Sequence, residues 1–129
     1  MTLSWQCICI DADDPRAIAT WWAEFIGWRL THVSDKEAVL EPPEGSPQDG
    51  ISPDILFIKV PEGKTVKNRV HLDWRPDDQA AEVARAEAMG ATHVDLGQGD
   101  AETVVMADPE GNEFCIRRAF TPAELASLQ

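Results

Sequence analysis

Residues 67–74, Lys-Asn-Arg-Val-His-Leu-Asp-Trp, decide how this chain is organised. Apolar and polar side chains alternate along the stretch, which predicts a β-strand with two different faces. The apolar face, which suits a protein core, holds Val70, Leu72 and Trp74. The other face places the imidazole of His71 beside the carboxylate of Asp73, a pair that a buried strand does not need. This face is a candidate site, although a histidine bonded only to Asp73 or to the backbone would have a structural role.

The same stretch opens a second copy of the first half of the chain. Four short segments recur in the same order and at similar spacing: 8–11 as 70–73, 31–33 as 92–94, 43–45 as 109–111, and 57–59 as 115–117. Internal similarity of this kind indicates a duplicated structural unit. We therefore predict one domain over 1–129, built from two β-α-β-β-β modules. The modules cover about 3–60 and about 69–120, with a linker at 61–68.

Capping and turn signals place the elements of each module. In the first module we expect a strand at 5–10, a helix that begins at Pro15 after the N-cap Asp14 and ends at Gly27, and strands at 28–33, 38–41 and 54–60. In the second module we expect a strand at 67–74 and a helix at 77–89, with Asp77 as N-cap and Gly90 at its end. A capping box at Thr121 predicts a short C-terminal helix over 122–128.

One segment of the first module has no counterpart in the second. Residues 46–54 form an excursion where the second module passes almost directly into its last strand. Loops are where duplicated scaffolds acquire function. The excursion is therefore interpreted either as a flap over a pocket or as a contact with another subunit.

Composition limits the class of protein. A chain of 129 residues is long enough for one domain with its own core. The net charge of −12 argues against nucleic acid as a partner, because an acidic protein repels phosphate. No apolar run reaches the length of a membrane span, and the N-terminus has no basic segment before an apolar one. We expect a cytoplasmic protein without a membrane partner.

The three cysteines are Cys7, Cys9 and Cys115. An odd number in a cytoplasmic chain argues against a disulfide framework, and no C-x-x-C spacing is present. Cys7 and Cys9 lie two apart on a predicted strand, so they share a face. Free cysteines also serve as small buried hydrophobic residues, and the spacing alone assigns no chemistry to this pair.

The tandem modules, the His-bearing stretch 67–73 and the Asp-Pro-Glu-Gly-Asn turn at 108–112 resemble the vicinal oxygen chelate superfamily. The chain looks most like its small bacterial glyoxalase-like proteins. The superfamily includes glyoxalase I, extradiol dioxygenases, fosfomycin-resistance enzymes and bleomycin-binding proteins. The resemblance implies an α+β fold in which tandem βαβββ modules form a curved mixed sheet around a cavity, with the helices outside. It implies no particular reaction, because this scaffold hosts unrelated chemistries.

In the metal-dependent members that the chain resembles, ligands come from the first, fourth, fifth and eighth strands. Carried over by position, these fall on Cys7, Phe57, His71 and Cys115. Only His71 matches a usual ligand type, and a phenylalanine cannot coordinate an ion. We favour a cavity that binds an organic ligand without a metal cofactor. The alternative is a zinc ion held by Cys7, His71 and Cys115, with one open position.

Strand alternation gives this cavity an apolar floor with charged ends. The expected ligand contacts are Trp5, Cys7, Cys9, Phe57, Lys59, Cys115 and Arg117. Lys59 and Arg117, related by the repeat, either clamp an acidic group or lie in solvent paired with carboxylates. In a metal-free enzyme, His71 is the general acid or base, with Asp73 or Glu113 as its partner.

Two classes of function remain open for a chain of this kind. One is a lyase or isomerase that acts on a small organic molecule. The other is a binding protein that sequesters a cationic drug, as in the bleomycin-binding members. The negative charge and missing metal ligands favour the binding protein, whereas the polar pairs near His71 favour the enzyme. A homodimer is expected in either case, because duplicated modules of this kind often pair between chains.

Overall fold

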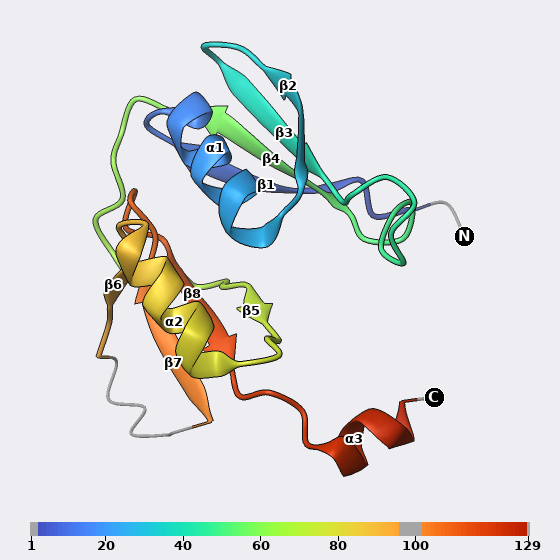
Figure 1. The fold of residues 1–129 in the computed structure, drawn as a ribbon. Helices are drawn as coiled ribbons and strands as arrows, with labels where there is room; N and C mark the ends of the chain where they lie inside the picture. Colours follow the sequence, from blue (N-terminus) through green and yellow to red (C-terminus); the bar gives the residue numbers. More distant parts are fainter. Residues whose placement is uncertain (1–2, 96–101, 129) are drawn as a thin grey trace. The chain divides into compact units, whose positions relative to one another are not determined.

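A computed structural model describes residues 3–95 and 102–128 of the chain, which divides into two compact units, Met1–Gly63 and Lys64–Gln129 (Figure 1). Each unit is described by itself. No helix among the described residues is long and apolar enough to cross a membrane.

Unit 1 is one β-α-β-β-β module. Its elements are β1 (Cys7–Ala12), α1 (Pro15–Ile26), β2 (Arg29–Val33), β3 (Glu37–Glu41) and β4 (Asp54–Lys59). The sheet has the order β1-β4-β3-β2, with β1 parallel to β4 and the other neighbours antiparallel. As predicted, Asp14 caps α1 by accepting a bond from the amide of Ala17, and Gly27 ends it with a φ of 72°. A positive φ favours glycine, so the end of the helix follows directly from the sequence.

The core of unit 1 lies between α1 and one face of this sheet. Ile18, Trp22 and Phe25 of α1 are buried, and so are the residues of β3 and β4 that point toward the helix: Ala38, Leu40, Ile55 and Phe57. Figure 1 shows α1 lying across the sheet. Phe57 is fully buried and pairs in register with Ile10, whereas Cys9 pairs with Leu56. The expectation that Phe57 shares a face with Cys7 and Cys9 is therefore wrong.

Unit 2 repeats the module. Its elements are β5 (Asp73–Trp74), α2 (Gln79–Ala88), β6 (Thr92–His93), β7 (Thr103–Ala107) and β8 (Glu113–Arg117), followed by α3 (Pro122–Ser127). The sheet order β5-β8-β7-β6 and the parallel first pair match those of unit 1. The duplication read from the sequence is confirmed. How the two modules are arranged about a common cavity stays a prediction.

The repeat predicted from the sequence aligns Phe57 with Cys115, and this alignment of the two fourth strands is wrong by one residue. Cys115 pairs with Asp73, on the opposite face from Trp74 and Ile116, whereas Phe57 lies on the helix-covered face of its sheet. A one-residue slip moves a side chain to the other face of a sheet. Residues 57–59 are therefore not the equivalents of 115–117, and Lys59 is not the counterpart of Arg117.

The strand predicted at 67–74 is much shorter than expected. Only Asp73 and Trp74 form β5, and Val70, expected in the core, is 78% exposed. The amide of Asn68 donates to the Glu113 carboxylate at 3.0 Å, and the first backbone bond to β8 is from Cys115 N to Leu72 O, also 3.0 Å. The Glu113 side chain thus accepts the backbone N–H that would otherwise have bonded to a neighbouring strand.

Two further differences concern the ends of elements. The N-cap of α2 is Asp78 rather than Asp77, and its carboxylate accepts from the amide of Ala81 at 3.1 Å. The excursion after β3 consists of consecutive turns over 43–52, in which Gly45 N donates to Asp49 at 3.0 Å. These turns test neither interpretation of the excursion, as a flap over a pocket or as a contact with another subunit.

The turn at 108–112 is built around a buried carboxylate. Oδ1 of Asp108, which is 5% exposed, accepts from the amides of Glu110 and Asn112 at 3.0 Å each. Gly111 adopts a φ of 88°, where a side chain would be strained. These bonds join β7 tightly to β8 and fix where β8 begins.

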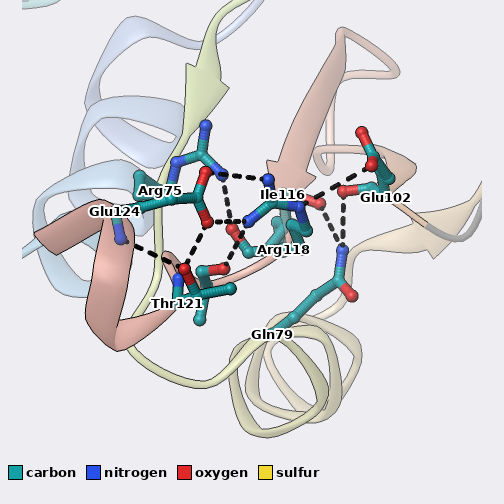
Figure 2. Close-up of polar contacts among 8 residues, drawn as sticks. Arg75, Gln79, Glu102, Ile116, Arg118, Thr121 and Glu124 are labelled. Atoms are coloured by element: carbon teal, nitrogen blue, oxygen red, sulfur yellow. Dashed lines mark hydrogen bonds and ion pairs between the residues drawn. The ribbon is translucent and has the colours of Figure 1, made fainter.

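A polar network ties α3 to the end of β8 (Figure 2). The Arg118 guanidinium donates to both carboxylate oxygens of Glu124, at 2.7 and 2.9 Å. Glu124 also accepts from the amide of Thr121 at 2.9 Å, which completes the predicted capping box. Arg75 donates to the carbonyl of Arg118 at 2.6 Å and lies over the Phe120 ring, 4.0 Å from its centre. Because α3 buries none of its residues, these contacts are what position it.

Candidate functional site

Three potential ligand or proton-transfer groups meet on one face of the unit 2 sheet. The Nδ1 atom of His71 lies 3.1 Å from Oδ1 of Asp73 and 3.6 Å from Sγ of Cys115. The meeting follows from strand geometry: Asp73 and Cys115 are direct partners between parallel β5 and β8, and His71 lies two residues before Asp73. His71 and Asp73 are exposed, and Cys115 is buried below them.

Arg117 joins this cluster from the next position on the same face of β8. Its Nη1 lies 3.4 Å from Oδ2 of Asp73, so one carboxylate spans His71 and Arg117. The Nε atom of Arg117 is buried and has no hydrogen-bond partner among the described residues. A buried donor without a partner favours an acceptor that comes from a ligand or from water.

The thiol of Cys115 is protonated in this environment. Burial, and then the charge of and hydrogen bond to Asp73, raise the pKa of Cys115 to about 11, although Arg117 and Lys67 act in the opposite direction. A thiolate is the reactive form of cysteine, so at neutral pH this residue is not an activated nucleophile. Cys115 thus lies buried beneath the cluster, and the His71–Asp73 pair is its exposed part.

Glu113, the other predicted partner of His71, is engaged elsewhere. Its Oε1 accepts from Nζ of Lys64 at 2.9 Å, and its Oε2 accepts from the amide of Asn68 at 3.0 Å. Burial pushes the pKa of Glu113 up, but these hydrogen bonds and the Lys64 charge outweigh it, and the net pKa is lowered. Asp73 is therefore the partner of His71, and Glu113 anchors the linker (61–68) to β8.

The candidates in unit 1 do not all meet, because Cys7 and Cys9 lie on the sheet face opposite Phe57. Sγ of Cys7 lies 3.9 Å from Sγ of Cys9, and Nε1 of Trp5 donates to the Cys7 carbonyl at 3.2 Å. Lys59 donates to the Asp13 carbonyl, and its Nζ lies 3.8 Å from the Asp13 carboxylate. Lys59 thus has the alternative role, a strand-end lysine paired with an acidic residue. The predicted meeting of Cys7 with His71 and Cys115 involves both units and stays a prediction.

The unit 2 cluster also fits a divalent metal ion. The ligand atoms of His71, Asp73 and Cys115 all lie within 4.8 Å of one another. For tetrahedral zinc, bond lengths of about 2.0–2.3 Å imply N to S and N to O separations of roughly 3.6 and 3.4 Å, close to the 3.6 and 3.1 Å seen. Within unit 2, Asp73 is the third potential ligand beside His71 and Cys115, whereas the alternative with Cys7 stays a prediction. The i, i+2 spacing of His71 and Asp73 was the signal for Asp73.

Comparisons with known proteins agree with this fold. A family model described as a glyoxalase-like domain matches residues 7–117. No curated protein sequence matches the chain. A glyoxalase/bleomycin resistance protein/dioxygenase family enzyme from Burkholderia phytofirmans is similar in structure, with 18% identity, a TM-score of 0.66, and coverage of 89% of this chain and 98% of that one.

Two similar structures are named for antibiotic resistance. The fosfomycin resistance protein FosX from Listeria monocytogenes, solved with Mn(II) and sulfate, has 12% identity, a TM-score of 0.68 and full coverage of both chains. The bleomycin resistance determinant encoded on the transposon Tn5 has 13% identity and a TM-score of 0.57, covering 92% of this chain and 100% of that one. Identities this low establish a common fold and leave the reaction open.

Proposed function

The chain belongs to the glyoxalase-like domain family of the vicinal oxygen chelate superfamily, and from this premise we propose that it acts on a small organic molecule, with His71 as the general acid–base group. The observation that carries the proposal is the 3.1 Å contact between Nδ1 of His71 and the Asp73 carboxylate. A carboxylate on one ring nitrogen holds the proton there and leaves the other nitrogen, Nε2, to accept one.

Asp73 and Arg117 complete the proposed site. Asp73 stabilises the imidazolium that forms when Nε2 takes a proton, and Arg117 contacts the same carboxylate from its other side. The unused donors of Arg117, among them the buried Nε, suit a carboxylate or carbonyl oxygen on the ligand. A base beside an oxyanion donor is the arrangement that removes a proton next to a carbonyl. We therefore propose a lyase or isomerase reaction on a small acidic or carbonyl compound.

A zinc-dependent form of the same site is the second candidate, and the spacing of His71, Asp73 and Cys115 favours it. These three residues would hold the ion, which supplies a Lewis acid for a carbonyl oxygen when bound. The Cys115 thiol must then lose its proton, and because its pKa is raised to about 11, metal affinity should rise steeply with pH.

Metal content and ligand binding, measured on the same protein, separate the candidates. Elemental analysis of the purified chain, and of Asp73→Asn and Cys115→Ser variants, decides between metal-free and zinc forms. A thermal-shift screen with α-keto acids, aromatic diols and cationic glycopeptides then identifies the ligand class, since a ligand of the folded state raises the melting temperature. Stabilisation by glycopeptides alone, with no turnover, would indicate a sequestering protein.

Two matched variants test the role of His71 once a ligand is found. His71→Gln should keep the fold and ligand binding while turnover falls by about 100-fold or more. His93→Gln removes another exposed histidine of unit 2, one paired with Glu87 outside the cluster, and should leave turnover unchanged. Normal turnover by His71→Gln would end the proposal.

A further inference from the structure

Cys7 and Cys9 depart from the usual behaviour of free cysteine. Cys9 is exposed and Cys7 is half-buried, whereas Cys115 is buried. An unpaired cysteine normally serves as a small buried hydrophobic residue, and that explanation fits Cys115 alone. The two remaining thiols project from the face of the unit 1 sheet opposite the one that carries Phe57.

The geometry points to a dithiolate binding site: we propose that Cys7 and Cys9 together bind a thiophilic metal ion of the zinc–cadmium type. Their Sγ atoms are 3.9 Å apart. Two thiolates on a tetrahedral zinc ion, each about 2.3 Å from the metal, lie roughly 3.8 Å from each other. The pair thus already has the separation that one edge of such a site requires.

The strand keeps this separation fixed. All six residues of β1 pair in register with β4, and the Trp5 indole donates to the Cys7 carbonyl at 3.2 Å. Two side chains on one face of a paired strand are preorganised, so little conformational entropy is lost when an ion joins them. Water or a small free thiol would fill the remaining coordination positions of such an ion.

A disulfide fits the same pair less well. Residues two apart on a strand have Cα atoms roughly 6.6–6.8 Å apart, at the upper limit of disulfide geometry. Closing the bond would require β1 to bend away from the register that β4 imposes. An ion that bridges the sulfurs at their present separation needs no such change.

The charges around the pair favour a cation. The carboxylates of Asp11 and Glu37 are close enough to Cys9 to act on it through their negative charge. A negative environment disfavours a bare thiolate and attracts a positive ion that can displace the proton. The site lies wholly within unit 1 and does not depend on the function proposed for unit 2.

Cadmium titration of a Cys115→Ser background tests the site, because that variant keeps only Cys7 and Cys9 as thiols. The metal alone is the probe, and the readouts are the thiolate-to-cadmium charge-transfer absorption and the protons released. We expect one site with two thiolates and release of about two protons per ion. Adding Cys9→Ser or Cys7→Ser should weaken binding by at least about ten-fold.

A matched variant separates the effect of where the two thiols lie from the effect of how many thiols there are. Ile8→Cys combined with Cys9→Ser, again in the Cys115→Ser background, keeps two thiols but places them on opposite faces of β1. Circular dichroism checks that the fold is kept. The proposal would be overturned if this variant bound cadmium as tightly as the protein with Cys7 and Cys9. It would also be overturned if the absorption of the Cys7–Cys9 protein showed only one thiolate on the ion. Adding His71→Gln should leave the cadmium site intact, so its outcome is independent of activity in unit 2.

Discussion

Asp73 and Cys115 face each other directly across β5 and β8, and this one pairing brings the groups of the candidate site in unit 2 together. Burial, and after it the Asp73 carboxylate that contacts His71, raises the pKa of the Cys115 thiol to about 11. In the function proposed for it, the site presents an acid–base pair to the ligand while its cysteine stays protonated. Loss of the Asp73 charge should affect both groups, and the thiol can be followed without knowing the substrate.

We predict that Cys115 is the last of the three cysteines to be alkylated. With a pKa of about 11, roughly one thiol in a thousand is ionised at pH 8, and burial limits access as well. Asp73→Asn removes a charge that raises this pKa, so the Cys115 rate should rise about three-fold or more. Mass spectrometry of iodoacetamide-treated protein measures each rate.

Asp77→Asn is the matched control for this measurement, because Asp77 is an exposed carboxylate near the start of α2. It should leave the Cys115 rate as in the unchanged protein. The account of the site would be wrong if Cys115 reacted as fast as Cys9, or if Asp73→Asn slowed its reaction.

The Glu113 carboxylate should contribute to stability in a pH-dependent way. Its pKa lies below the ordinary value of 4.5 because hydrogen bonds from Lys64 and the Asn68 amide outweigh the effect of burial. The contribution is therefore complete above about pH 4.5 and is lost as pH falls through the lowered, folded-state value. Glu113→Gln should cost about 1–3 kcal/mol of unfolding free energy at pH 7, because a buried, charge-assisted hydrogen-bond set is weakened.

Urea denaturation at pH 7 and in acid measures this effect. The difference in unfolding free energy between the unchanged protein and Glu113→Gln should shrink in acid, as the pH falls through the lowered pKa of Glu113. Glu62→Gln changes an exposed carboxylate of the linker and should leave the unfolding free energy unchanged at either pH. An equal cost at all pH values would mean that Glu113 acts by shape rather than by charge.

Much of the fold could be predicted because its signals are local and occur twice. Asp14, Pro15 and Gly27 mark the ends of α1 by their backbone preferences, and the Thr121 capping box does the same for α3. The recurrence of short segments then identified the modules, and their matching sheet orders confirm it.

The errors arose where the answer depended on pairing rather than on local preference. Which face Phe57 occupies is decided by its register with Ile10, and counting residues across the 46–54 excursion cannot supply that register. Likewise, the Asn68 amide donates to the carboxylate of Glu113, 45 residues away, instead of to a neighbouring strand. His71 and Asp73 could be paired from their spacing alone, but their contacts to Cys115 and Arg117 required the register of β5 with β8.

Phe57 should behave as a core residue and not as a ligand contact. It is fully buried under α1, so Phe57→Ala should lower the unfolding free energy by about 3–5 kcal/mol. Leu56→Ala, on the opposite face and only half-buried, should cost clearly less. Chemical denaturation of both variants gives the comparison. A small cost for Phe57→Ala would restore the original interpretation of Phe57 as a cavity-lining side chain.

Glu124 should determine whether α3 stays attached to the end of β8. The hydrogen bonds from Arg118 and from the Thr121 amide lower the pKa of Glu124 to about 2, so the pair persists at pH 3 and is lost only as the pH falls through about 2. Because α3 buries no residue of its own, Glu124→Gln should increase hydrogen exchange and proteolysis within 121–128 while β5 to β8 keep their protection. Glu44→Gln, an exposed carboxylate in unit 1, should leave the protection of 121–128 unchanged. Unaltered protection of 121–128 in Glu124→Gln would show that the stacking of Arg75 on Phe120 holds this segment, and Arg75→Ala would then be the variant that releases it.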